Sequence, residues 1–141
     1  ALLLDDPALI SNALIEFLRL ESSVQGLCRT TIQDVTIRGT TIPAGEKVMM
    51  LYGSANRDPR EFGDAADQLD VRRDIPRHLA FSSGPHFCIG SHLARLQARV
   101  SFEELLALHP DISVDVAGAE RHRSPFVRGF VSLPAHGFAP A

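Results

Sequence analysis

The strongest signal in the chain is the segment Phe81-Ser82-Ser83-Gly84-Pro85-His86-Phe87-Cys88-Ile89-Gly90, which directly precedes a predicted helix over residues 91–109. A thiolate just before a helix is favoured by the positive end of the helix dipole and by unpaired backbone N–H groups. Gly84 permits the tight turn that aims the sulfur, while Gly90 and Ala94 leave one face of the first helical turn without bulky side chains. These residues predict a metal ligand at Cys88 with room beside it for a flat molecule.

Around this segment the sequence alternates between helical and strand-like stretches. Asp6 and Pro7 resemble an N-cap and first helical residue, and apolar residues recur at helical spacing up to Leu20. Turn residues and the absence of a sustained period predict that residues 53–87 are mostly loop, and a loop of this length is usually functional. Short β-branched or apolar runs predict strands at residues 27–32, 35–37, 40–42, 47–52, 112–116 and 126–133. The first four of these strands are expected to form a small antiparallel sheet.

Length and composition exclude several classes of protein. The 141 residues are 45% hydrophobic and carry a net charge of −3, which suits one globular domain and argues against nucleic acid or an anionic membrane as the main partner. No apolar run approaches the roughly 20 residues that span a bilayer. Two cysteines, Cys28 and Cys88, make no disulfide framework and suit a reducing cytosol. Because the chain starts at Ala1 without Met, we expect a fragment.

The pattern F-x-x-G-x-x-x-C-x-G, matched at Phe81, Gly84, Cys88 and Gly90, resembles the haem-binding signature of the cytochrome P-450 family. A chain of this composition would match it by chance in roughly one case in 2,000. The resemblance implies that Cys88 is the axial thiolate ligand of the iron of haem b. It further implies that Arg29 and His86 bind the haem propionates. The residues implied to lie around the sulfur and the porphyrin are Phe81, Gly84, Ile89, Gly90 and Ala94.

A second match lies in the first predicted helix, where Glu16 and Arg19 fit the family's E-x-x-R pair on one helical face. About 0.65 such pairs are expected by chance, so the weight comes from its position before the Cys segment. The resemblance implies a buried pair that locks the core. Where the family usually completes a triad with an arginine, this chain has Gln68, which leaves open whether Arg72 or Arg73 takes that place.

The resemblance implies an α+β, mainly helical fold: the C-terminal part of the cytochrome P-450 fold, with a small β-sheet, a long meandering loop and a helix after the Cys loop. Residues 1–141 would be the haem-proximal part of a single domain, because the family's long helix with the oxygen-activating residues has no counterpart here. The parent enzyme would be a monooxygenase that inserts one oxygen atom of O2 into a small apolar organic substrate. The isolated chain should lack this activity.

The same resemblance suggests partners and a substrate cavity. Electrons would come from a ferredoxin-type or flavoprotein donor, and a cytoplasmic monomer is expected. A basic patch for an acidic ferredoxin could be formed by Arg72, Arg73, Arg77, Arg95 and Arg99. Candidate residues for lining the substrate cavity are Val24, Leu27, Val127 and Phe130.

Two alternatives stay open at this point. A non-enzymatic domain could bind zinc through His86, Cys88 and His92, with His78 completing a tetrahedron. The chain could also be an inactive truncated remnant, whose unpartnered surfaces would lie exposed as large apolar patches.

Overall fold

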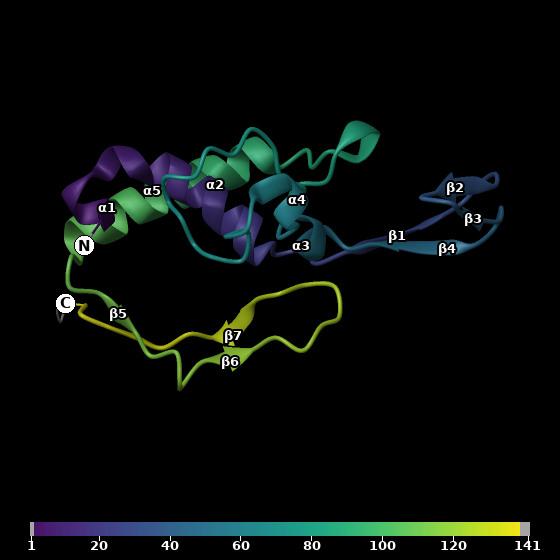
Figure 1. Cartoon of the computed structure of the whole chain (residues 1–141). Coiled ribbons are helices and arrows are strands. Elements are labelled where there is room, and N and C mark those ends of the chain that lie inside the picture. Colours follow the sequence, from purple (N-terminus) through teal and green to yellow (C-terminus); the bar gives the residue numbers. More distant parts are fainter. Residues whose placement is uncertain (1, 139–141) are drawn as a thin grey trace.

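The computed structural model describes residues 2–138 and contains helices that pack on one another and antiparallel strand pairs that extend from them (Figure 1). The helical elements are α1 (Leu2–Asp5), the 3-10 turn η1 (Pro7–Leu9), α2 (Ile10–Glu21), α3 (Tyr52–Ala55), α4 (Pro59–Phe62), the 3-10 turn η2 (Gly84–His86) and α5 (Ser91–Leu108). The strands are β1 (Leu27–Thr30), β2 (Val35–Ile37), β3 (Thr40–Ile42), β4 (Lys47–Met50), β5 (Ser113–Val114), β6 (Glu120–Arg121), β7 (Phe130–Ser132) and β8 (Ala135–His136).

The two long helices confirm the predicted ones. The 3-10 turn at Pro7 leads into α2, which ends where Ser22 adopts a left-handed conformation with φ 40°. Helix α5 begins after Gly90 and ends before Pro110, which cannot continue a helix. The helices lie side by side, with the rings of Phe17 and Phe102 5.8 Å apart (Figure 1).

The strands pair antiparallel, as predicted, but they form separate two-stranded pairs rather than one small sheet. Strand β1 pairs with β4, β2 with β3, β5 with β8 and β6 with β7. The β2–β3 hairpin turns at Arg38 and Gly39, whose φ angles of 49° and 82° are the positive values that a two-residue type I′ turn requires. Strands β6 and β8 have only two residues each, which is too short to give an alternating sequence pattern.

Residues 53–87, predicted to be mostly loop, contain three short helical segments. Helix α3 begins two residues after β4 ends, and η2 lies within the Cys segment, just before Phe87 and Cys88. At α4, Asp58 caps the helix by accepting a hydrogen bond from the Arg60 N–H at 3.0 Å, and Pro59 takes the first helical position. Helices of one turn carry no periodic signal, which is why the sequence pattern misses them.

The interior described by the structure is as polar as it is apolar. The buried apolar residues are Ile10, Ala13, Leu14, Tyr52 and Ala66, and the buried polar residues are Glu16, Arg19, Ser22, Asn56 and Ser91. Since buried polar groups are stabilising only when they are hydrogen-bonded, a polar network at the end of α2 determines how the segments meet.

Candidate haem-binding site

Cys88 lies in the short loop between η2 and α5. The chain before α5 projects away from the paired helices (Figure 1). Its N–H donates to the carbonyl of Phe81 at 2.9 Å, and its carbonyl accepts from the N–H of Ser91 at 3.2 Å. The thiol is free and exposed. The loop therefore presents the sulfur to the surroundings two residues before α5 begins.

Two glycines shape this loop. Gly84 has φ +64°, a left-handed conformation that favours glycine. Its carbonyl accepts from the N–H of Phe87 at 3.0 Å, which closes the turn. At Gly90, a Cβ atom would lie 3.9 Å from the Cys88 Sγ. Glycine at this position thus leaves the side of the sulfur open.

The residues next to Cys88 in the sequence carry exposed apolar side chains. Phe87 and Ile89 flank Cys88 in the sequence and are exposed, as is Leu93 in the first turn of α5. Ala94 is exposed as well, and its N–H donates to the carbonyl of Gly90 at 2.9 Å. A thiol among exposed apolar groups at a helix start fits a flat, apolar metal complex such as haem.

The structure brings the two predicted propionate ligands together. Arg29 on β1 and His86 in η2 line one cavity of about 350 Å³ beside the Cys loop. The buried Tyr52 lines it too, and its hydroxyl lies 3.2 Å from the Oγ of Ser82. A guanidinium, an imidazole and two hydroxyls suit a carboxylate ligand. Tyr52 and Ser82 were not predicted, because only the fold places them beside Arg29.

Phe81 packs against Arg95 and His78. The guanidinium carbon of Arg95 lies 5.0 Å from its ring centroid, and the ring of His78 is centred 5.9 Å away. Burial, and next the charge of Arg95, hold the pKa of His78 below its usual range. The neutral ring accepts a hydrogen bond at Nδ1 from the N–H of Ala80 at 3.1 Å.

Glu16 and Arg19 form a fully buried ion pair, with 2.6 Å between Oε2 and Nε. The carboxylate also accepts from the N–H of Asp70 at 3.0 Å and lies 3.3 Å from the Nε of Arg73. Arg73 therefore completes the triad. Arg72 is exposed, and Gln68 contributes only its carbonyl, which accepts from Arg19 at 3.4 Å.

The environment of Glu16 keeps its carboxyl ionised. Burial on its own would raise the pKa, but the hydrogen bonds and charge of Arg19, the N–H of Asp70 and the side chain of Arg73 together hold the pKa below its usual value. The remaining Arg19 donors reach the carbonyls of Asn56 and Ala66, both at 2.6 Å. The pair thus ties α2 to the segments that follow β4.

The predicted zinc site does not form. Among residues 2–138, the structure places no three His, Cys, Asp or Glu side chains where they could hold a metal ion. His86 belongs to the cavity of Arg29, and His78 packs on Phe81. The four-ligand alternative is therefore wrong, because its side chains point to different surroundings.

Of the four residues predicted for the substrate cavity, the structure brings two together. Val24 and Val127 face each other in an isolated antiparallel bridge between the end of α2 and the segment before β7. Leu27 lies on β1, opposite Met50. Phe130 lies on β7, with the guanidinium carbon of Arg121 4.4 Å from its ring centroid.

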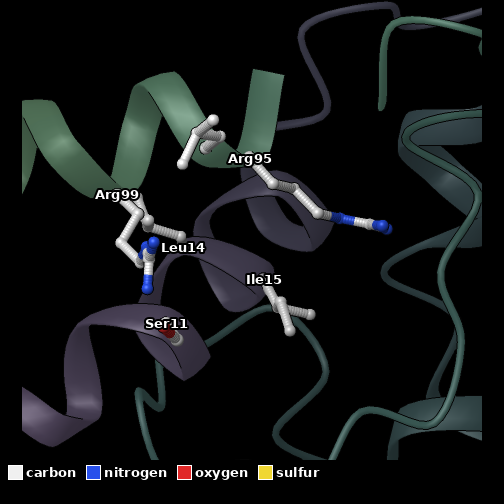
Figure 2. Close-up of a pocket in the computed structure, with 6 residues that line it drawn as sticks. Ser11, Leu14, Ile15, Arg95 and Arg99 are labelled. Carbon is white, nitrogen blue, oxygen red and sulfur yellow. The ribbon is translucent and has the colours of Figure 1, made fainter. Parts of the chain in front are cut away.

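The predicted basic patch loses one member. Arg73 belongs to the buried triad, where its Nη1 donates to the carbonyl of Phe62 at 2.9 Å. Of the other four, Arg77 pairs with Glu61 at 3.0 Å, and Arg95 and Arg99 line a cavity of about 310 Å³ between α2 and α5. Figure 2 shows that the Arg95 side chain extends away from Leu14 and Arg99.

Comparison with known proteins shows the family of this chain. The family model for Cytochrome P450 matches residues 6–109. The chain is 52% identical over 133 residues to Cytochrome P450 130 of Mycobacterium tuberculosis, covering 94% of this chain and 33% of the relative. It is 44% identical over 136 residues to the Vitamin D(3) 25-hydroxylase of Pseudonocardia autotrophica, covering 94% and 34%.

Solved structures give the same result. The P450 monooxygenase TamI bound to tirandamycin C superimposes with a TM-score of 0.89 at 41% identity, covering 96% of this chain and 34% of that one. Cytochrome P450 CYP109Q5 from Chondromyces apiculatus superimposes with a TM-score of 0.92 at 40% identity, covering 99% and 36%. The chain belongs to the cytochrome P450 family. It spans about a third of the length of the curated relatives it matches.

Proposed function

We propose that this chain is the haem-proximal part of a haem-thiolate monooxygenase in which Cys88 is the axial ligand of the iron of haem b. The observation that carries the proposal is the exposed Cys88 thiol before α5, in a loop whose His86 lines one cavity with Arg29. When bound, haem with a thiolate ligand supplies oxygen activation, because electron density from the sulfur favours O–O cleavage. The enzyme would insert one oxygen atom of O2 into a small apolar organic substrate.

The residues of this chain would hold the cofactor and exclude water from one side of it. The backbone N–H groups near Ile89 and Gly90 would donate to the sulfur of Cys88. Arg29 and His86 would bind the propionates, while Phe81 and Ala94 would pack against the porphyrin. The substrate cavity would be lined in part by Val24, Leu27, Val127 and Phe130. The vitamin D(3) hydroxylase among the relatives supports an apolar substrate class.

The electron donor would be an acidic ferredoxin or a flavoprotein. The positive charge that attracts this donor would come from Arg72, Arg77, Arg95 and Arg99. These side chains would attract the donor without touching the cofactor. We further propose that the enzyme acts as a cytoplasmic monomer, in keeping with two free, exposed cysteines. No helix in the part of the chain that the structure describes is long and apolar enough to cross a membrane.

The test is the absorption spectrum of the reduced, haem-loaded protein with carbon monoxide. We expect the strongly red-shifted Soret band of thiolate ligation, present in the control Cys28→Ser and lost in Cys88→Ala. A band that survives Cys88→Ala, or a protein that binds no haem when haem is supplied, would contradict the proposal.

The inactive-remnant alternative has an observation in its favour. Helix α5 exposes Leu93, Leu96 and Val100 along one side, a spacing that places them on neighbouring turns. Haem titration of the 141-residue chain separates the two hypotheses. Stoichiometric binding with a thiolate spectrum supports a competent proximal site, whereas self-association and binding of a hydrophobic dye without haem uptake support the remnant.

A further inference from the structure

Asn56, which follows α3, is buried, and each end of its side-chain amide bonds to a different part of the chain. Its Nδ2 donates to the Oγ of Ser22 at 2.7 Å, and its Oδ1 accepts from the N–H of Leu79 at 2.7 Å. The exposed fraction of Asn56 is only 1%. Its backbone carbonyl also accepts from the Nη1 of Arg19 at 2.6 Å. This one residue therefore links the end of α2, the buried ion pair and the segment that leads to Cys88.

The bond to Leu79 fixes the start of the Cys loop. The carbonyl of Leu79 accepts from the N–H of Ser82 at 2.9 Å, which closes a turn immediately before Gly84. Within this turn the carbonyl of Phe81 accepts from the N–H of Cys88 at 2.9 Å. A displacement of Leu79 would therefore be transmitted through two further hydrogen bonds to the residue that carries the thiol.

Two serines in left-handed conformations indicate that the backbone near Asn56 and the Cys loop is held in a fixed geometry. Ser22 has φ 40° and Ser82 has φ 61°, values at which a residue with a Cβ is strained. Each keeps a hydroxyl that glycine would lack: Ser22 Oγ accepts from Asn56, and Ser82 Oγ lies 3.2 Å from the hydroxyl of the buried Tyr52. One contact leads to Tyr52 in α3 and the other to Asn56, the residue that follows α3.

We infer that Asn56 is a positioning residue, which holds the Cys88 loop at a fixed place relative to the buried Glu16–Arg19 pair. The inference rests on the proposed haem-thiolate function and extends it to a residue that touches neither the sulfur nor the cavity of Arg29 and His86. Without the acceptor at Asn56 Oδ1, the Leu79 N–H would lose its partner and the loop would gain freedom, so the Cys88 sulfur would be held less firmly where it would bind the iron.

The test compares Asn56→Ala with Ser22→Ala in the haem-loaded protein. Both variants remove the bond between Asn56 and Ser22, but only Asn56→Ala removes the acceptor for Leu79. In Asn56→Ala we expect a fraction of the carbon monoxide complex to lose the thiolate-type Soret band and the reduction potential of the iron to shift. Ser22→Ala should keep the wild-type band and potential, although its melting temperature falls. If Asn56→Ala does not fold, Asn56→Leu serves the same comparison, because leucine fills a similar volume and offers no acceptor to the Leu79 N–H.

Amide hydrogen exchange in the protein without carbon monoxide gives a second measurement. We expect exchange at Leu79, Ser82 and Cys88 to become about tenfold faster in Asn56→Ala and to stay unchanged in Ser22→Ala, as one lost hydrogen bond predicts. If Asn56→Ala keeps the wild-type spectrum and potential and only melts earlier, its role is merely structural and the inference is wrong. If the wild-type protein itself lacks the thiolate band, it is the proposed function that fails.

Discussion

Arg73 Nε lies 3.3 Å from Glu16 Oε1, so one buried carboxylate receives side-chain hydrogen bonds from both Arg19 on its own helix and Arg73 in the loop after α4. Arg73 also donates to the carbonyls of Phe62, Ala65 and Gln68. The Arg73–Glu16 charge pair thus holds the loop that precedes the Cys segment to α2, while the same guanidinium links this loop to the end of α4.

Removing this arginine should destabilise the fold. We expect Arg73→Ala to lower the free energy of unfolding by roughly 2–3 kcal/mol, since it leaves several acceptors of a partly buried network unpaired. The matched control is Arg72→Ala, whose exposed side chain should matter by at most about 0.5 kcal/mol. Urea unfolding of the haem-loaded protein measures both, and equal losses in the two variants would show that Arg73 does not serve the triad.

The ion pair should also make stability depend on pH. The pKa of Glu16 is lower in the folded protein than in the unfolded chain, so its contribution is fully present above the unfolded value of about 4.3 and is lost as the pH falls through the folded value. Below about pH 4.3, the free energy of unfolding should therefore fall less steeply with decreasing pH in Glu16→Gln than in wild type. Thermal melts between pH 3 and 7 measure this, with Glu103→Gln on the exposed side of α5 as the control. Parallel curves for wild type and Glu16→Gln would refute the linkage.

The cavity shared by Arg29 and His86 predicts how tightly haem is held. Arg29→Leu and His86→Leu should each weaken haem binding roughly ten- to a hundredfold, the effect of losing a charge-assisted hydrogen bond. The thiolate-type Soret band should persist, because Cys88 is untouched. The rate of haem transfer to an apo-globin measures the loss, and Arg38→Leu at the β2–β3 turn controls for the removal of charge. Unchanged transfer rates would place the propionates elsewhere.

Electron transfer should depend on ionic strength if the arginines dock an acidic donor. The rate of reduction by a ferredoxin should fall as salt rises from about 0.01 to 0.5 M, a range in which the screening length shrinks from about 30 Å to a few ångströms. Arg72→Glu should reduce the rate at low salt, whereas Arg38→Glu on the distant hairpin should not. A rate indifferent to salt would remove the docking proposal.

The local features of this protein and its family could be predicted from the amino-acid sequence. The positions of α2 and α5 follow from apolar spacing and from Pro7, Gly90 and Pro110, which act on their immediate neighbours. The Cys88 segment is equally local, since its glycines and its cysteine lie within a few residues of one another. Such features are legible in a sequence because their physical cause is the conformational preference of neighbouring residues.

Which distant residues meet could not be predicted from local patterns and follows from the tertiary structure. It selected Arg73 rather than Arg72 for the buried carboxylate, placed Arg29 and His86 on one cavity, and excluded the zinc ligand set. It also gave Asn56 its two partners, although the sequence shows no more than an asparagine before Arg57. These outcomes depend on side-chain directions and on burial between segments far apart in the chain, where each polar group must find a partner once water is excluded.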